Sequence, residues 1–392
     1  MNRKQILRYT VYFMATAVVG GIIVFSQFVN LRQLEWRRMI GLTNSNTQVN
    51  KLDGQCRPEA ASDLSAVQSK YIQKLAEYQT LCGSRVADKY MIFTSMPNSK
   101  ESASELARSL SFELKAMEQA GVTPVVIVEP TTEWGLIDFE EFGTGFYDQW
   151  IKDYFVALRS TGLSDAAMGI WVPFPEANLP YWNRRNATPK DFAQIVNRYL
   201  GIYKSQFPNS KASILLNSAT YESDDFDWER GEYLSLLPYV SDIKPGLVDS
   251  FGLQGFPWSP PATREGNGIF DAREFLNHEL AVEAARKLGV KEIWFNTGTY
   301  ATKYAQDDAK RVSVTAAKRK EVSYGIINEV KRAKSDGYAV WVNIFAEDKS
   351  RVAESTDWSY LFLGKDHQQV FHDFIQRLHG EGVGIGLYDV KK

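Results

Sequence analysis

The feature that most constrains this chain is a repeated alternation of short apolar segments with longer amphipathic ones, which begins at Lys89. The apolar segments, which we predict as strands, are 90–94, 124–128, 169–174, 212–217, 248–256, 292–296, 338–345 and 383–388. The predicted helices are 102–120, 142–160, 189–207, 271–288, 312–335 and 368–379. Strands that alternate with helices indicate parallel pairing with right-handed crossovers. A count close to eight pairs favours a (β/α)₈ barrel of the TIM type over an open doubly wound sheet.

The predicted barrel occupies residues 89–392, and no predicted strand in it is followed by a glycine-rich dinucleotide loop or a Walker loop. The usual nucleotide-binding interpretations are therefore excluded. The formal net charge is −2, which indicates no nucleic-acid partner. The four histidines show no metal-ligand spacing, so we expect neither a metal nor a cofactor.

The N-terminal segment Tyr9–Leu31 carries no charge between Arg8 and Arg32. At 1.5 Å per residue it is long enough to cross a hydrocarbon layer of roughly 30 Å. Basic residues before it favour an inside N-terminus, although arginines after it weaken that bias. A cleaved signal peptide is the alternative, but no clean cleavage site follows. We predict an uncleaved signal anchor over 1–31, a single transmembrane helix with the main domain on the extracytoplasmic side of the cell membrane.

Residues 32–88 are polar with helical stretches and are predicted to form a helical stalk or cap. The two cysteines of the chain, Cys56 and Cys82, both lie in this segment. In an oxidising compartment they would form a disulfide that contributes roughly 3 kcal/mol. Two unrelated free thiols are the alternative.

Polar and aromatic side chains recur where the predicted strands end. These residues are Glu129, Glu176, Asn178, Gln254, Trp258, Asn296, Tyr300, Asn343 and Glu347. In a parallel barrel the carboxyl ends of the strands converge on one end of the barrel, where active sites lie. The shared position is a stronger indication than any single residue.

Glu176 stands out because it follows a buried strand that two prolines end, and because Asn178 and Trp182 come soon after it. Barrel enzymes present an acid to a sugar in this way. A helix N-cap or a surface-turn glutamate is the alternative interpretation.

The aromatic content is high, with ten Trp, nineteen Tyr and twenty-two Phe. Such a content is common in proteins that handle carbohydrates, and a large aromatic core would also explain it. The rings that follow predicted strand ends, and that we expect to stack on sugars, are Trp134, Trp182, Trp258 and Tyr300. Trp171 and Trp294 lie within strands, where packing in the core is expected.

The segment from Val172 to Trp182 resembles glycoside hydrolases of clan A, and family 26 most closely. That family carries a strand ending Arg-Pro-Phe-His-Glu-Met-Asn-Gly, followed by aromatics. Pro173, Phe174, Glu176, Asn178 and Trp182 fit the pattern. The resemblance implies a (β/α)₈ hydrolase of O-glycosyl bonds with Glu176 as general acid/base. Here Val172 and Pro175 replace the arginine and the histidine of the family pattern.

The resemblance covers roughly residues 120–350. Residues 248–258, with Gln254 and Trp258, are similar to the sixth strand of the family. Residues 338–345 are similar to its eighth strand, which implies that Trp341 stacks on a sugar. This alignment leaves too few strands before Glu176 unless the stalk or the C-terminal tail supplies one.

The family places its nucleophile, a glutamate, on the seventh strand, where this chain has Asn296. A retaining mechanism needs a second carboxylate about 5 to 5.5 Å from the first, and an amide cannot form the glycosyl ester. One hypothesis is that the chain only binds glycan. Another is that Glu129, Glu347 or Asp348 acts instead, as a base to water in an inverting arrangement. The third is a different strand register, with Glu292 nearest in sequence.

Glu129 has the most weight among these substitutes, because it ends an apolar strand just before Pro130. A partly buried carboxyl near a second one would have a raised pKa, as a general acid requires. A structural hydrogen-bond acceptor is the alternative. Glu347 stays a candidate for substrate binding, although basic residues follow it and favour a solvated loop.

These observations predict a membrane-anchored glycoside hydrolase that acts on an extracytoplasmic polysaccharide. The alternative is a catalytically inactive glycan-binding protein, or an accessory subunit of a polysaccharide or envelope assembly.

Overall fold

The computed structural model describes seven stretches of the chain. They are residues 87–132, 135–178, 188–218, 236–257, 272–298, 315–345 and 365–388. The predicted anchor, residues 32–86 of the predicted stalk, and both cysteines lie outside them. No helix in these seven stretches combines the length and the apolar character that a membrane span needs.

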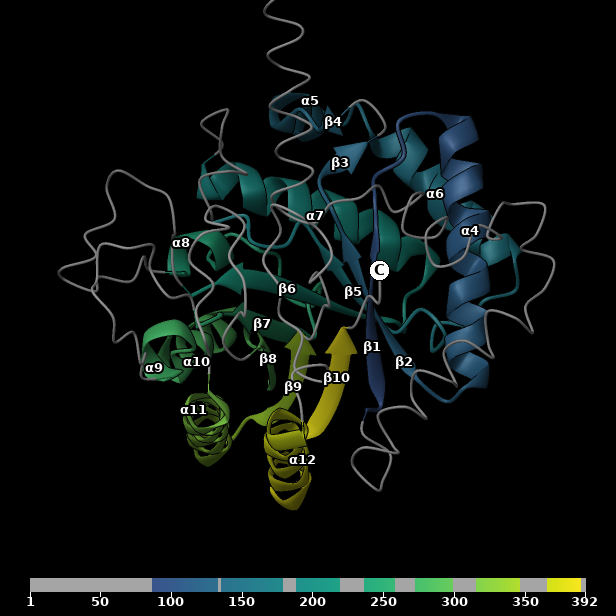
Figure 1. The fold of residues 1–392 in the computed structure, drawn as a ribbon. Helices are drawn as coiled ribbons and strands as arrows, with labels where there is room; N and C mark the ends of the chain where they lie inside the picture. Colours follow the sequence, from purple (N-terminus) through teal and green to yellow (C-terminus); the bar gives the residue numbers. More distant parts are fainter. Residues whose placement is uncertain are drawn as a thin grey trace, which may run out of the picture.

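Eight parallel strands form a closed barrel, as the alternation in the sequence predicts (Figure 1). They are β1 (Lys89–Thr94), β2 (Thr123–Val128), β5 (Ile170–Pro173), β6 (Lys211–Asn217), β7 (Ser250–Gln254), β8 (Glu292–Thr297), β9 (Ala339–Phe345) and β10 (Gly384–Tyr388). Their order around the barrel is β1-β10-β9-β8-β7-β6-β5-β2. The C-terminal strand β10 therefore closes the barrel between β9 and β1, and it supplies the strand that the sequence comparison lacks before Glu176.

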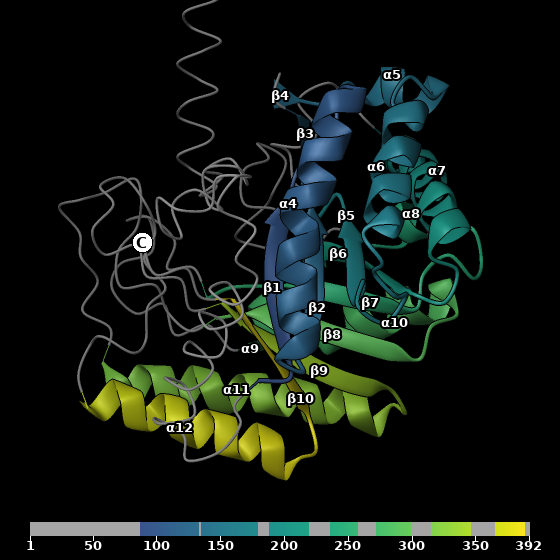
Figure 2. The ribbon, with the colours of Figure 1, turned by 90° about the vertical axis from the view of Figure 1, so that its right-hand side faces the viewer.

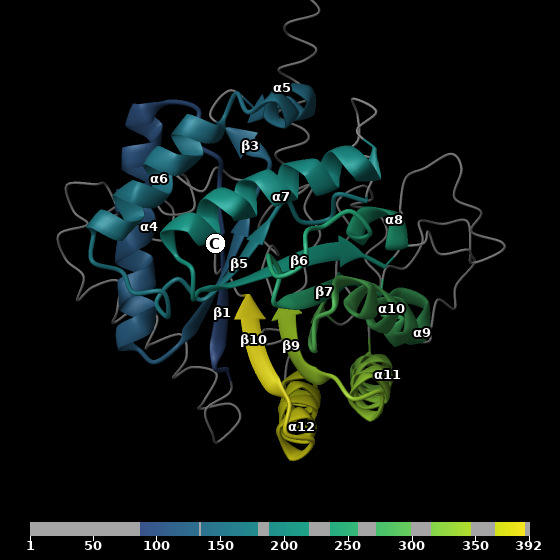
Figure 3. The same cartoon turned by 180° about the vertical axis from the view of Figure 1, so that it is seen from behind.

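Six longer helices in the described stretches surround the barrel. They are α4 (Lys100–Gln119), α6 (Asp148–Ser160), α7 (Pro189–Gln206), α10 (His278–Leu288), α11 (Ala316–Ser335) and α12 (Lys365–Gly380). Figure 2 shows α11 and α12 side by side, and Figure 3 shows α7 on the outside of the barrel, where it contacts β5. Shorter elements are α5 (Phe139–Thr144), α8 (Leu237–Val240), α9 (Ala272–Phe275), and the two-residue strands β3 (Thr131–Thr132) and β4 (Gly135–Leu136), which pair antiparallel.

The helix boundaries follow from local sequence. Thr188 caps α7 through a reciprocal pair of hydrogen bonds with Asp191, and Pro189 occupies the first turn, as predicted. Two predicted helices are each divided. The segment 142–160 is broken at Gly145, whose φ of 93° ends α5 in the left-handed conformation. The segment 271–288 is broken where Asn277 caps α10.

The barrel interior is filled by side chains that alternate along the strands with those facing the helices. The apolar residues of this interior are Met91, Val125, Ile127, Ile170, Val172, Leu215, Trp294 and Trp341. On β5 the neighbouring Trp171 faces outward and packs among helix side chains. Trp171 and Trp294 are both fully buried, so their predicted core positions are confirmed. Near the carboxyl ends of the strands, the inward-facing residues are polar.

Candidate active site

Glu176 lies on a short strained turn directly after β5. Phe174 and Glu176 both have positive φ angles, 53° and 56°, which non-glycine residues rarely adopt. The turn is held from both sides, because Phe174 N–H donates to Val128 O at 2.8 Å and Glu176 N–H donates to Leu215 O at 2.9 Å. Strained residues held in this way cluster at functional sites. The bond to Leu215 fixes Glu176 against β6, at the carboxyl-terminal end of the barrel.

Four amide side chains from successive strands connect to the Glu176 carboxylate. Asn217 Nδ2 donates to Glu176 Oε1 at 2.9 Å, and Gln254 Nε2 donates to the same oxygen. Asn296 Nδ2 donates in turn to Gln254 Oε1 at 2.5 Å, and Asn343 Nδ2 donates to Asn296 Oδ1 at 2.7 Å. We call Gln254, Asn296 and Asn343 the amide ladder. They lie in the inward-facing rows of β7, β8 and β9, near the carboxyl ends of these strands.

Asn178 supports this arrangement from behind. Its Nδ2 donates to Asn217 O at 2.7 Å, and its Oδ1 accepts from Asn217 N–H at 2.9 Å. Both polar groups of this buried side chain therefore bind the backbone at the end of β6. In this way Asn178 positions Asn217, and sugar binding by Asn178 stays a prediction.

Glu129 is the second carboxyl group at this end of the barrel. It directly follows β2, its N–H donates to Thr94 O at 2.9 Å, and it shares the inward-facing row with Val125 and Ile127. The residue is 6% exposed. Burial raises the pKa of Glu129 from 4.5 to about 8, and the charge of Glu176 adds to the increase. The raised pKa favours the protonated form of Glu129 at neutral pH.

Trp341 is not placed where the resemblance implies. It is 3% exposed and stacks on Trp294 with ring centroids 4.6 Å apart, and its Nε1 donates to Glu292 Oε1 at 3.1 Å. It occupies the barrel interior one layer below Asn343. The interpretation of Trp341 as a sugar-stacking ring is therefore wrong, because its faces are occupied inside the protein.

The alternative strand register, with Glu292 in place of Asn296, is also excluded. Glu292 begins β8, pairs with Lys211 at 3.4 Å, and lies at the amino end of the barrel, away from Glu176. Asn296 lies in register with Gln254 and Asn343 at the carboxyl end. The amide therefore occupies the expected position.

Several predicted site residues lie outside the described residues. They are Trp134, Trp182, Trp258, Tyr300 and Glu347. Within the seven described stretches, no group of three or more His, Cys, Asp or Glu side chains is placed to hold a metal ion.

Asn217 lies at the site but is not among the predicted site residues. Its signal is present, because Asn217 ends a predicted strand and follows Ser213 and Leu215 at two-residue spacing. Because every second residue of a strand faces the same side, this alternation predicts that Asn217 faces the barrel interior.

Comparison with known proteins gives similarity of structure only. No family model matches the chain, and no curated protein matches it in sequence. Among solved structures, the family 1 β-glucosidase from Thermotoga maritima is 11% identical, with a TM-score of 0.47 over 77% of this chain and 85% of that one. Virulence factor SghA from Agrobacterium tumefaciens is 10% identical, with a TM-score of 0.49 over 79% and 86%. The endo-1,4-β-D-mannanase from Thermotoga petrophila RKU-1 is 10% identical, with a TM-score of 0.43 over 77% and 94%.

Because these TM-scores are below 0.5, the fold is assigned from the strand order of this chain itself. The site offers a buried carboxyl with a raised pKa and a second carboxyl that accepts from amide donors, both at the carboxyl-terminal end of a closed barrel. Two carboxyl groups in different environments are what acid–base chemistry at neutral pH requires.

Proposed function

We propose that this protein is a glycoside hydrolase that acts on an extracytoplasmic polysaccharide, with Glu176 and Glu129 as its two reacting carboxyl groups. The observation that carries the proposal is the position of these two carboxyl groups, which follow the paired parallel strands β2 and β5 at the carboxyl-terminal end of the barrel. Hydrolysis of a glycosidic bond needs one carboxyl that carries a proton and one that is ionised. Glu129 supplies the second carboxyl group, which the amide of Asn296 does not.

The apolar segment Tyr9–Leu31 supports the further proposal that the protein is anchored in the cell membrane with the barrel outside the cytoplasm. Fractionation of cells that express the full chain tests the anchoring. We expect the protein in the membrane fraction, and release by detergent but not by high salt. Protease added to intact spheroplasts should digest the barrel, and an undigested barrel would contradict the orientation.

The activity is tested with the purified full chain on a panel of polysaccharides and aryl glycosides. We expect release of reducing ends from at least one substrate. Glu176→Gln should lower kcat/KM by roughly 10²–10⁴-fold, the range for removal of a reacting acid or base. Glu105→Gln changes an exposed glutamate on α4 in the same way and should leave turnover unchanged. Equal activity of the Glu176 variant and the wild type would overturn the proposal.

A second candidate is a glycan-binding protein without hydrolysis. Asn296 favours it, because an amide at this position donates and accepts hydrogen bonds but cannot form a glycosyl ester. Isothermal titration with each polysaccharide of the panel separates the two candidates. Binding by the wild type, with no product after prolonged incubation, would favour the binding protein.

A further inference from the structure

We infer that Glu129 is the proton donor of the pair and Glu176 its ionised partner, with the amide ladder as the device that holds Glu176 in that form. This inference rests on the proposed function and reverses the role that the sequence resemblance implies for Glu176. It divides the residues into two reacting carboxyls and three positioning residues, Gln254, Asn296 and Asn343.

The direction of the hydrogen bonds supports an ionised Glu176. An ionised carboxylate only accepts, so Asn217 and Gln254 must both present their NH₂ groups to Glu176 Oε1. Gln254 then has its oxygen directed at Asn296, which must present its own NH₂ group. Asn296 in turn directs its oxygen at Asn343. The polarity of the ladder is therefore determined from the Glu176 end.

The far end of the ladder does not compete with this direction. Asn343 is fully buried, and its Oδ1 has no hydrogen-bond partner among the residues that the structure describes. Within the seven described stretches, no donor at that end orients the amides. Each N–H dipole along the ladder points toward Glu176, and hydrogen bonds donated to a carboxylate favour its charged form.

The surroundings of Glu129 have the opposite effect. On the β1 side, Glu129 N–H donates to the carbonyl oxygen of Thr94, whose side chain carries no charge. The turn after β5 contributes the Glu176 carboxylate, whose charge raises the pKa of Glu129. In the described parts of the chain no lysine, arginine or histidine forms an ion pair with Glu129. Burial without a cation, next to a negative charge, keeps the proton on Glu129.

The resulting step balances with water as the second reactant. The bond between the anomeric carbon and the glycosidic oxygen breaks, and its electron pair stays on that oxygen, which takes the proton of Glu129. The oxygen of a water molecule forms the new bond to the anomeric carbon, and Glu176 takes the proton that this water releases. Exchange with solvent then returns the proton to Glu129 and removes it from Glu176.

Leaving-group dependence distinguishes the two roles. An acid catalyst matters for a poor leaving group and little for one that departs without protonation. We expect Glu129→Gln to lower kcat/KM by roughly 10²–10⁴-fold on the natural glycan, but by less than about 10-fold on the dinitrophenyl glycoside of the same sugar. Glu176→Gln should lower both by roughly 10²–10⁴-fold. The reverse pattern would overturn the assignment.

A direct measurement of protonation tests the inference without any turnover. In infrared difference spectra of the full chain at neutral pH, the C=O band of a protonated carboxyl should be lost in Glu129→Gln and kept in Glu176→Gln. Loss of the band in Glu176→Gln alone would contradict the inference. If no glycan is hydrolysed but this band is lost in Glu129→Gln, the proposed function fails while the protonation assignment survives.

The role of the amide ladder is tested with Asn343→Leu, which removes the last donor and adds no charge. If the ladder stabilises ionised Glu176, the acidic limb of the pH–rate profile should move to higher pH while the basic limb stays. Asn197→Leu is the matched control, because its amide binds Asp242 O and Lys244 N–H outside the barrel. A purely structural role would lower the rate and leave both limbs in place, and that result would overturn the positioning role.

Discussion

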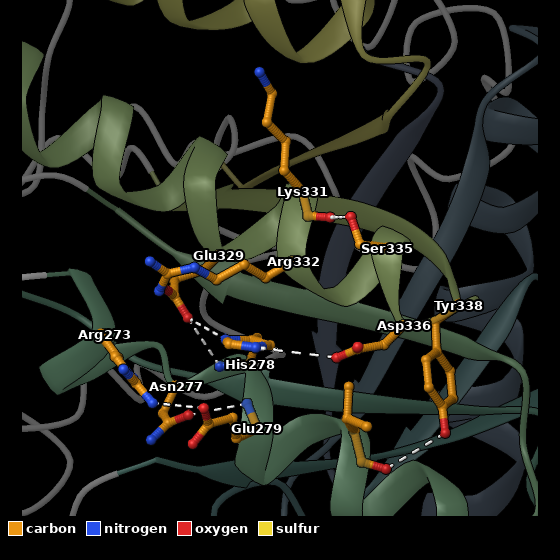
Figure 4. A network of polar contacts seen from close by, with 11 residues as sticks. Arg273, Asn277, His278, Glu279, Glu329, Lys331, Arg332, Ser335, Asp336 and Tyr338 are labelled. Atoms are coloured by element: carbon orange, nitrogen blue, oxygen red, sulfur yellow. Dashed lines mark hydrogen bonds and ion pairs between the residues drawn. The ribbon is translucent and has the colours of Figure 1, made fainter.

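Two buried glutamates of this protein have opposite surroundings. Glu129, at the carboxyl-terminal end of the barrel, is 6% exposed, and Glu329, on α11, is 1% exposed. Glu329 Oε2 accepts from His278 N–H at 3.1 Å and lies 2.7 Å from His278 Nδ1, while its Oε1 accepts from Arg332 at 2.5 Å (Figure 4). Glu129 has no such ion pair among the described residues, and the charge that acts on it is that of Glu176.

This difference in surroundings indicates that Glu329 is a structural carboxylate and Glu129 a reactive carboxyl. Glu329 joins the N-terminus of α10 to the middle of α11, and the network continues to Asp336, whose Oδ2 lies 4.0 Å from His278 Nε2 (Figure 4). A buried charge with partners on both oxygens is compensated, and breaking such a set destabilises the fold. A buried carboxyl without a cation keeps its proton instead, and such perturbed groups cluster at functional sites.

The largest expected effect is the pH dependence that Glu129 gives to stability. Its pKa is about 8 in the folded protein against an ordinary 4.5, so between these values the folded state binds more protons than the unfolded state. The contribution is fully present below pH 4.5 and is lost as pH rises through about 8. Between about pH 5 and pH 9 we expect the wild type to lose roughly 4 kcal/mol of unfolding free energy relative to Glu129→Gln.

Denaturant unfolding at several pH values measures this difference. Glu105→Gln, at an exposed position on α4, serves as the control and should follow the wild type across the range. Parallel stability curves for the wild type and Glu129→Gln would show that Glu129 is ionised at neutral pH, and the comparison with Glu329 would lose its basis.

The second effect is the cost of removing Glu329. Glu329→Ala leaves His278 buried and Arg332 without its carboxylate partner, so we expect a loss of about 3 kcal/mol at neutral pH. Glu129→Gln, which replaces a neutral acid by a neutral amide of similar shape, should cost less than about 1 kcal/mol at the same pH. Glu283→Ala on the exposed face of α10 is the matched control. Similar losses of unfolding free energy for Glu329→Ala and Glu129→Gln would contradict the distinction between an ionised Glu329 and a protonated Glu129.

The sequence predicts the barrel well because each strand and helix has a strong local signal. The predicted strand 292–296 is observed as Glu292–Thr297, and the predicted helix 189–207 as Pro189–Gln206. The order of β10 within the barrel could not be read locally, since closure is a property of the whole sheet. The divided helices at Gly145 and Asn277 were missed because the apolar pattern continues across both breaks.

The candidate site was predicted less completely, for two physical reasons. The strand-end positions of Gln254, Asn296 and Asn343 are visible in the sequence, but their hydrogen bonds to one another are not, because these depend on the spatial separation of side chains from different strands. The environment of Trp341 depends on its level along the barrel axis as well as on the side of the sheet that it faces. It lies on the same inward row as Asn343 but one layer lower, and an alternating pattern reports only the face.

The smallest expected effect concerns the exposed part of the Glu329 network. The Arg332 side chain is 50% exposed, so water and salt screen its charge, and Glu329 keeps both contacts to His278 when Arg332 is removed. We therefore expect Arg332→Ala to lower the free energy of unfolding by less than about 1 kcal/mol at low ionic strength, and by still less at high salt. Denaturant unfolding at two salt concentrations measures this. A loss as large as that of Glu329→Ala, and insensitive to salt, would mean that Arg332 and not His278 compensates the buried charge, and the network would then depend on its exposed member.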